Sequence, residues 1–166
     1  MSEKTVAILG ATGVVGQQML QCLEERDFPV GRLVPLASQR SVDAGKAVRF
    51  AGEDVPVRLA EPDAFEGVDI VLGAADDATA RALMPEAVKR GAVCVDNSHA
   101  FRMDADVPLV VPEINAADIA GHHGIIANPN CATIIGLVPV WPLHQIAGVK
   151  RLVVSTYQAA SGAGKP

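Results

Sequence analysis

The sequence lacks an excess of positive charge and lacks a long hydrophobic segment. It has 14 lysine and arginine residues against 19 aspartate and glutamate residues, which gives a formal net charge of −5 at pH 7. Because a nucleic-acid-binding surface needs clustered positive charge, we expect no nucleic-acid partner. The longest apolar run, residues 134–143, is interrupted by Pro139 and Pro142. It is too short to span a bilayer, so no membrane partner is expected.

Cysteine is scarce as well. The three cysteines, Cys22, Cys94 and Cys131, form an odd set without metal-ligand spacing. We therefore expect free thiols, no bound metal and a cytoplasmic location. The first residues include an acid and lead directly into a strand-like run, which is unlike a signal peptide.

Short apolar runs alternate with helical stretches along the chain. Hydrophobic residues make up 49% and charged residues 20%, which excludes a disordered chain. The alternation is typical of an α/β fold with a parallel sheet. Strands are predicted at residues 5–9, 31–37, 47–51, 55–59, 68–72, 92–96, 109–111, 124–127 and 151–157, and helices at 14–26, at 78–90 and from about residue 131.

Two of the cysteines are expected in the hydrophobic core. In the first helix, one apolar face is formed by Val15, Met19, Cys22 and Leu23. Cys94 lies inside an apolar strand, where a free thiol acts as a small hydrophobic residue. In the second strand, Pro35 favours a place at a sheet edge or strand end.

A glycine loop joins the first strand to the first helix. Its sequence, Gly10-Ala-Thr-Gly-Val-Val-Gly16, has the spacing of a dinucleotide-binding turn. The first glycine permits the tight turn, Gly13 lets the backbone approach a pyrophosphate, and Gly16 lets helix and strand pack closely. We expect Thr12, Val14 and Val15 to share this phosphate site at the helix N-terminus. The alternative is a strand-helix turn that binds no ligand.

The end of the second strand favours NADP over NAD. An NAD site needs an acid about 20 residues beyond the glycines, but no acid occurs between Asp27 and Asp43. Arg40 and Ser41 stand there instead, and their side chains suit a 2′-phosphate. The alternative is that Arg40 is an exposed loop residue without a ligand.

The third cysteine is a candidate nucleophile. Cys131 follows Asn128-Pro-Asn130, which ends a strand, and it precedes an apolar run that starts a helix. The partial positive charge at a helix N-terminus stabilises a thiolate, the nucleophilic form. A thiolate beside a nicotinamide indicates aldehyde oxidation or acyl reduction through a thioester. From its position alone, Cys131 could equally be a third core cysteine.

Several uncommon motifs occur together and in order along the chain. They are Gly10-Ala-Thr-Gly-Val-Val-Gly16, Ala37-Ser-Gln-Arg-Ser41, Asp96-Asn-Ser-His-Ala-Phe-Arg-Met-Asp104, Pro108-Leu-Val-Val-Pro-Glu-Ile-Asn115, Ile126-Ala-Asn-Pro-Asn-Cys-Ala-Thr133 and Ser155-Thr-Tyr-Gln-Ala-Ala-Ser-Gly-Ala-Gly164. With them the chain resembles the aspartate-β-semialdehyde dehydrogenases from end to end. The related N-acetyl-glutamyl-phosphate reductases are less similar, because they usually carry Gly-Cys where this chain has Asn130-Cys131.

The resemblance implies NADP-dependent reductive dephosphorylation of L-4-aspartyl phosphate to the semialdehyde, in the biosynthesis of lysine (through diaminopimelate), threonine and methionine. It implies that Cys131 is the nucleophile and that Gln158 orients the substrate. It places Arg102 at the phosphate, and it places Asn97 and Ser98 near the nicotinamide or the phosphate. Contacts to NADP are implied for the glycine loop, Arg40, Ser41, Ser161 and Gly162. The bland alternatives are a solvated ion pair for Arg102, an exposed strand residue for Gln158 and a plain turn for Ser161.

The resemblance also implies two domains and an incomplete second one. Residues 1–130 would form the Rossmann-type NADP-binding domain, with a doubly wound, mostly parallel sheet. Residues 131–166 would start a truncated α+β domain with the nucleophile helix and a strand. The family's histidine acid/base and its substrate-carboxylate arginine lie on a later helix, so we expect this chain alone to be inactive. The family's usual homodimer forms through the second domain.

The sequence departs from the family pattern at four positions. His99 and Ala132 stand where serine is usual, and Asp76 and Asp77 bring negative charge toward the expected pyrophosphate. These departures keep an alternative open, namely a truncated NADP-binding module or a non-catalytic paralogue.

Overall fold

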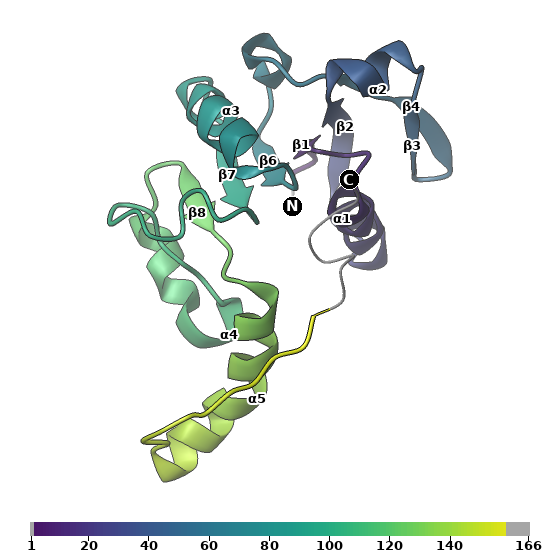
Figure 1. The fold of residues 1–166 in the computed structure, drawn as a ribbon. Helices are drawn as coiled ribbons and strands as arrows, with labels where there is room; N and C mark the ends of the chain where they lie inside the picture. The colour runs from purple at the N-terminus through teal and green to yellow at the C-terminus, as the bar shows by residue number, and fades with distance from the viewer. Residues whose placement is uncertain (1, 159–166) are drawn as a thin grey trace.

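A parallel sheet of six strands forms the centre of the computed structural model, which describes residues 2–158 (Figure 1). The strand order is β5-β2-β1-β6-β7-β8, and each neighbouring pair runs parallel. The strands are β1 (Lys4–Leu9), β2 (Val30–Ala37), β5 (Arg58–Leu59), β6 (Ile70–Gly73), β7 (Val93–Asp96) and β8 (Ile125–Ala127). The predicted Rossmann-type, doubly wound α/β sheet is confirmed.

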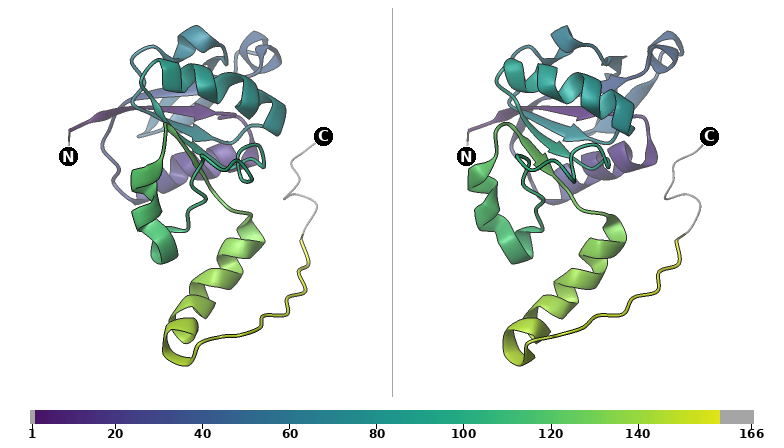
Figure 2. Two further views of the ribbon diagram at one scale, coloured as in Figure 1. Left: turned by 90° about the vertical axis from the view of Figure 1, so that its left-hand side faces the viewer. Right: turned by 60° about the vertical axis from the view of Figure 1, so that its left-hand side comes forward.

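Helices cover both faces of this sheet. The helix α1 (Val14–Glu25) lies on one face and α3 (Asp77–Lys89) on the other (Figure 2). Along β1, Val6 and Ile8 pack on the α1 side, whereas the next residues in alternation pack on the α3 side. Because successive side chains of a strand point to opposite faces, one strand supplies two cores. Full burial of each large aliphatic side chain contributes about 1.5–3 kcal/mol.

Short elements fill the connections. These are α2 (Gln39–Asp43), the antiparallel hairpin β3 (Ala47–Phe50) and β4 (Glu53–Pro56), the 3-10 helices η1 (Pro62–Phe65) and η2 (Ala116–Gly121), and α4 (Pro112–Asn115). The predicted strand at 109–111 is reduced to one parallel bridge between Leu109 and Ala127. After α3 the chain turns at Gly91, whose φ of +90° is in the left-handed region.

The last helix, α5 (Cys131–Ala147), leaves the sheet and has no buried residue. Figure 2 shows it projecting away from the sheet, with the following segment running back beside it. The strand predicted at 151–157 is wrong for the described residues, because that segment is extended but pairs with no strand. A strand needs a neighbour to take its backbone hydrogen bonds. No helix within residues 2–158 is long and apolar enough to cross a membrane.

The structure tests the expected positions of three residues, Cys22, Cys94 and Pro35. Cys22 is exposed rather than buried, because the face of α1 that meets the sheet is centred on Gly16 and Leu20. Cys94 is fully buried, as predicted. Pro35 lies inside β2, paired with Ile8 of β1. It is tolerated because β5 pairs with β2 only from Leu36 onward, so the side of β2 that lacks the proline N–H has no partner strand there.

Candidate active site

The turn after β1 leaves no room for side chains at two of its glycines. Gly10 has a φ of +91°, and a Cβ on it would lie 2.6 Å from the Ala74 carbonyl oxygen. A Cβ on Gly16 would lie 2.8 Å from the Cα of Ala11. Gly13 is the N-cap of α1, and its carbonyl oxygen accepts a hydrogen bond from Gln17 N–H at 3.0 Å. The backbone of the turn is therefore not covered by side chains at these glycines, next to the start of α1.

The first turn of α1 has the features of an anion-binding site. The N–H groups of residues 14–16 donate no hydrogen bond within residues 2–158, and that turn contains no acidic residue. The side chains of Val14 and Val15 are 52% and 42% exposed, so this helix end faces solvent. Free N–H groups and the helix dipole together favour a phosphate.

The glycine turn lines a cleft where the strand order reverses. The chain passes from β1 to β2 on one side and later returns to β6 on the other, so the carboxyl ends of these strands meet at one edge. A cleft of about 510 Å³ opens there, lined by the loops after β1, β2 and β6, including Thr12, Ser38 and Asp76. Ligands of open α/β sheets bind at this switch point.

The two residues predicted to bind a 2′-phosphate lie in different settings. Arg40 is exposed on α2, and the neighbouring Ser38 and Gln39 line the cleft. Ser41 is only 6% exposed, and its Oγ lies 3.5 Å from Thr12 Oγ1. Ser41 thus links α2 to the glycine turn, while Arg40 keeps its charge at the surface beside the cleft. Sequence reasoning did not single out Ser38 and Gln39, although they immediately precede Arg40.

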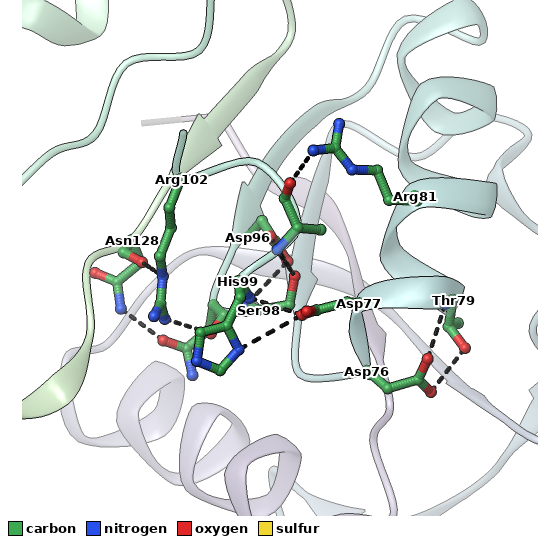
Figure 3. A network of polar contacts seen from close by, with 11 residues as sticks. Asp76, Asp77, Thr79, Arg81, Asp96, Ser98, His99, Arg102 and Asn128 are labelled. Carbon is green, nitrogen blue, oxygen red and sulfur yellow. Dashed lines mark hydrogen bonds and ion pairs between the residues drawn. The ribbon is translucent and has the colours of Figure 1, made fainter. Parts of the chain in front are cut away.

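A carboxylate lies in the same cleft. Asp76 is the N-cap of α3, and it accepts hydrogen bonds at 2.9 Å from both the N–H and the Oγ1 of Thr79 (Figure 3). The hydrogen bond from the Thr79 backbone, aided by its hydroxyl, holds the pKa of Asp76 below its usual value. Its negative charge is therefore present at neutral pH. Asp77 is used elsewhere, since its Oδ1 accepts the His99 N–H at 2.8 Å.

Arg102 does not line this cleft and is held by neutral groups. Its Nε donates to the Asn128 carbonyl oxygen at 2.9 Å, and one terminal nitrogen donates to the Asn97 carbonyl oxygen at 3.0 Å (Figure 3). The Asn128 amide also donates to Asn97 Oδ1 at 2.6 Å. Arg102 forms no ion pair with a carboxylate of residues 2–158. The solvated ion pair considered for Arg102 from the sequence is absent there, and the nearby Asp104 pairs with Arg81 instead. Arg102 therefore keeps an uncompensated positive charge and free N–H donors, as an anion site requires.

The loop that carries Arg102 begins with a turn in which a buried carboxylate accepts hydrogen bonds. Asp96, at the end of β7, is fully buried and accepts hydrogen bonds from Ser98 N–H at 3.1 Å and Ser98 Oγ at 2.6 Å. Ser98 Oγ in turn accepts the Ala100 N–H at 3.0 Å. Ser98 is 7% exposed, so its hydroxyl shapes the loop. The structure thus gives Ser98 a local structural partner and leaves Asn97 nearer to Arg102.

Cys131 is the first residue of α5 and is exposed, so it is not a third core cysteine. The helix is capped by Asn130, whose Oδ1 accepts the Ala132 N–H at 2.9 Å. This cap explains why the chain can carry alanine at position 132, where the resemblance implied serine. Gln158 is exposed in the extended segment after α5. The predicted cofactor residues Ser161 and Gly162 lie outside the described residues.

The sequence matches the family described as "Semialdehyde dehydrogenase, NAD binding domain" over residues 5–122. The chain belongs to this family. The match begins with β1 and extends through the glycine turn, the cleft and the Arg102 loop.

Individual relatives of the family carry the similarity beyond residue 122. The chain is 54% identical over 159 residues to an aspartate-semialdehyde dehydrogenase of Bacillus subtilis, which covers 96% of this chain and 45% of the relative. A crystal structure of aspartate-semialdehyde dehydrogenase II from Vibrio cholerae matches with a TM-score of 0.94 at 46% identity, over 99% of this chain and 49% of that one. The enzyme from Candida albicans, solved with NADP, matches with a TM-score of 0.68 at 28% identity, over 89% and 48%. The chain thus spans about half the length of the curated relatives it matches.

Proposed function

We propose that this chain forms the nucleotide-binding and nucleophile-bearing half of an NADP-dependent aspartate-semialdehyde dehydrogenase. The observation that carries the proposal is the hydrogen bond of 2.9 Å from Arg102 Nε to the Asn128 carbonyl oxygen. Asn128 lies three residues before Cys131. This hydrogen bond joins an uncompensated guanidinium to the backbone that delivers an exposed cysteine to a helix N-terminus. The sequence relatives name the same activity for proteins of twice this length.

The residues of the cleft fit a dinucleotide. A Cβ on Gly10 would clash with the Ala74 carbonyl, so the turn requires glycine there. The first turn of α1 offers to a pyrophosphate N–H groups that are unpaired within residues 2–158. Arg40 would pair with a 2′-phosphate from the rim, beside Ser38 and Gln39. When bound there, NADPH supplies the hydride for the reduction.

The chemistry of the chain's own residues follows from this placement. Cys131 Sγ attacks the acyl carbon of aspartyl phosphate, the carbon–oxygen bond to phosphate breaks, and a thioester remains on Cys131. Arg102 binds the leaving phosphate through its free N–H groups. After reduction the carbon–sulfur bond breaks, which releases the aldehyde and returns the thiolate. Gln158 would orient the substrate, as the resemblance implies.

The test is a chimera in which this chain replaces the matching half of the Bacillus subtilis relative. We expect phosphate-dependent reduction of NADP with aspartate semialdehyde, and we expect Cys131→Ala to abolish it. Cys22→Ala is the matched control, because Cys22 is also exposed but lies on α1. Turnover that survives in Cys131→Ala would refute the assignment. The 166-residue chain alone should bind NADP more tightly than NAD and show no turnover.

A nucleotide-binding module without turnover is the second candidate. It is favoured by one observation, namely that the cleft is lined entirely by residues between Leu9 and Thr79. A folded chimera that binds NADP but shows no activity would support it. The homodimer, the cytoplasmic location and the absence of nucleic-acid or membrane partners remain predictions from the sequence.

A further inference from the structure

The residues assigned to phosphate binding sit on a loop that has no regular structure of its own. Residues 97–108 connect β7 to the bridge at Leu109, and they include both Asn97 and Arg102. A loop of this kind needs contacts from neighbouring elements to hold a side chain in one place. The direction of Arg102 therefore depends on what fixes the loop.

One side chain outside the loop makes three hydrogen bonds to it. Arg81, in the second turn of α3, donates to both carboxylate oxygens of Asp104 at 2.5 and 2.8 Å and also to the Ala100 carbonyl oxygen. Its guanidinium carbon lies 4.5 Å from the centre of the Phe101 ring. Arg81 thus touches the loop at residues 100, 101 and 104, on both sides of Arg102 in the sequence.

The side chains of Arg81 and Arg102 lie on opposite sides of the loop and have different electrostatic settings. Figure 3 shows Arg81 on the α3 side and Arg102 on the side of Asn128. The charge of Arg81 is matched by Asp104, and hydrogen bonds from Arg81 hold the pKa of Asp104 below its usual value. Among the residues that the structure describes, Arg102 bonds only to neutral carbonyl oxygens. One guanidinium is engaged within the fold, and the other is left for a ligand.

We propose that Arg81 is a positioning residue for phosphate binding. It holds residues 100–104 against α3, so that the free N–H donors of Arg102 stay directed toward the substrate. This inference rests on the proposed function. A lysine cannot reproduce the clamp, because an ammonium is a point donor without the planar fork that reaches two carboxylate oxygens and a carbonyl together. No sequence motif marks Arg81, since its partners lie 19 and 23 residues away.

The test uses the same chimera and compares Arg81→Ala and Arg81→Lys with Arg90→Lys. Arg90 lies at the end of the same helix and also pairs with two carboxylates, Glu86 and Asp63, but it does not contact the loop. We expect Arg81→Ala to raise the KM for phosphate about tenfold, with the KM for NADP changed less than about twofold because the cleft is untouched. Arg81→Lys should fall between the parent and Arg81→Ala. Arg90→Lys should leave both KM values unchanged.

The KM values for phosphate and for NADP together distinguish a positioning role of Arg81 from a general loss of structure. If Arg81→Ala leaves the KM for phosphate unchanged while the parent chimera is active, the inference fails and the proposed function stands. If the KM values for phosphate and NADP rise by the same factor, Arg81 is merely structural and the inference also fails. A parent chimera without phosphate-dependent turnover overturns both. Amide hydrogen exchange gives a second measurement: Arg81→Ala should speed exchange at residues 99–104 but not in β6 or β7, and equal loss of protection throughout would contradict the clamp.

Discussion

A methyl group added at Gly10 should damage the nucleotide cleft far more than the same change at another glycine with positive φ. Gly45 is the matched control, with a φ of +61° and nothing within 4 Å of an added Cβ. An alanine at either position must adopt a left-handed backbone, which costs about 1–2 kcal/mol. Gly10→Ala meets a second penalty, because its Cβ would lie 2.6 Å from the Ala74 carbonyl oxygen.

That oxygen cannot move freely. It belongs to the residue whose N–H donates to the Leu9 carbonyl oxygen at 2.7 Å, at the junction of β1 and β6. Forced overpacking costs about 1–3 kcal/mol, so Gly10→Ala should lower the free energy of unfolding by about 2–5 kcal/mol. Gly45→Ala should lower it by about 1–2 kcal/mol.

Urea unfolding of both variants measures this difference, and a fluorescence titration with NADP measures its effect on the cleft. NADP affinity should fall in Gly10→Ala and stay unchanged in Gly45→Ala. If the two variants lose the same stability and bind NADP equally well, the close approach of Ala74 is not the reason that position 10 requires glycine.

Three further predictions concern charge, capping and buried thiol. Asp76→Asn keeps an N-cap of similar quality but removes a negative charge from the cleft, so NADP affinity should rise a few-fold at low salt and less at high salt; an unchanged affinity in a binding titration would remove Asp76 from the nucleotide's surroundings. Asn130→Ala removes the cap of α5 and should cost about 1 kcal/mol of helix stability, which far-UV circular dichroism during thermal unfolding should detect; a Gln145→Ala control on the same helix should show no such loss. Burial raises the pKa of the Cys94 thiol to about 12, so the unfolded chain releases this proton first, and the free energy of unfolding should fall by about 1.4 kcal/mol per pH unit between roughly pH 9 and 12. Urea titrations of Cys94→Ala at the same pH values should lack this component, and identical slopes in both proteins would contradict it.

The sheet was predictable because its signals are local. Buried runs such as 68–72 and 92–96 are apolar on both faces, and Gly91 marks a helix end by its conformational freedom. The face of α1 was half predicted: Met19 and Leu23 pack against the core. Val15 and Cys22 are exposed, and hydrophobicity alone did not distinguish them from the residues that meet the sheet. The segment 151–157 has a strand-like composition but pairs with no strand in the described residues, and composition cannot supply a partner.

The candidate site was predictable where a residue's role depends on its own backbone. The glycine turn and the start of α5 at Cys131 follow from neighbours in sequence. The partners of Arg102 and Arg81 do not, because Asn128 lies 26 residues from Arg102 and Asp104 lies 23 residues from Arg81. The burial of Ser41 against Thr12 also depends on the packing of α2 on the glycine turn. Such contacts arise from the order of strands in the sheet, which the sequence pattern leaves open.

The cleft of residues 9–79 and the helix that starts at Cys131 share no residues. The proposed coenzyme preference and the proposed reacting thiol can therefore be altered independently, by exchanging the short stretch after β2 or by changing the turn before α5. Substitutions after β2 could change which coenzyme is preferred without changing the surroundings of the Cys131 sulfur. This holds for engineering and for natural selection alike.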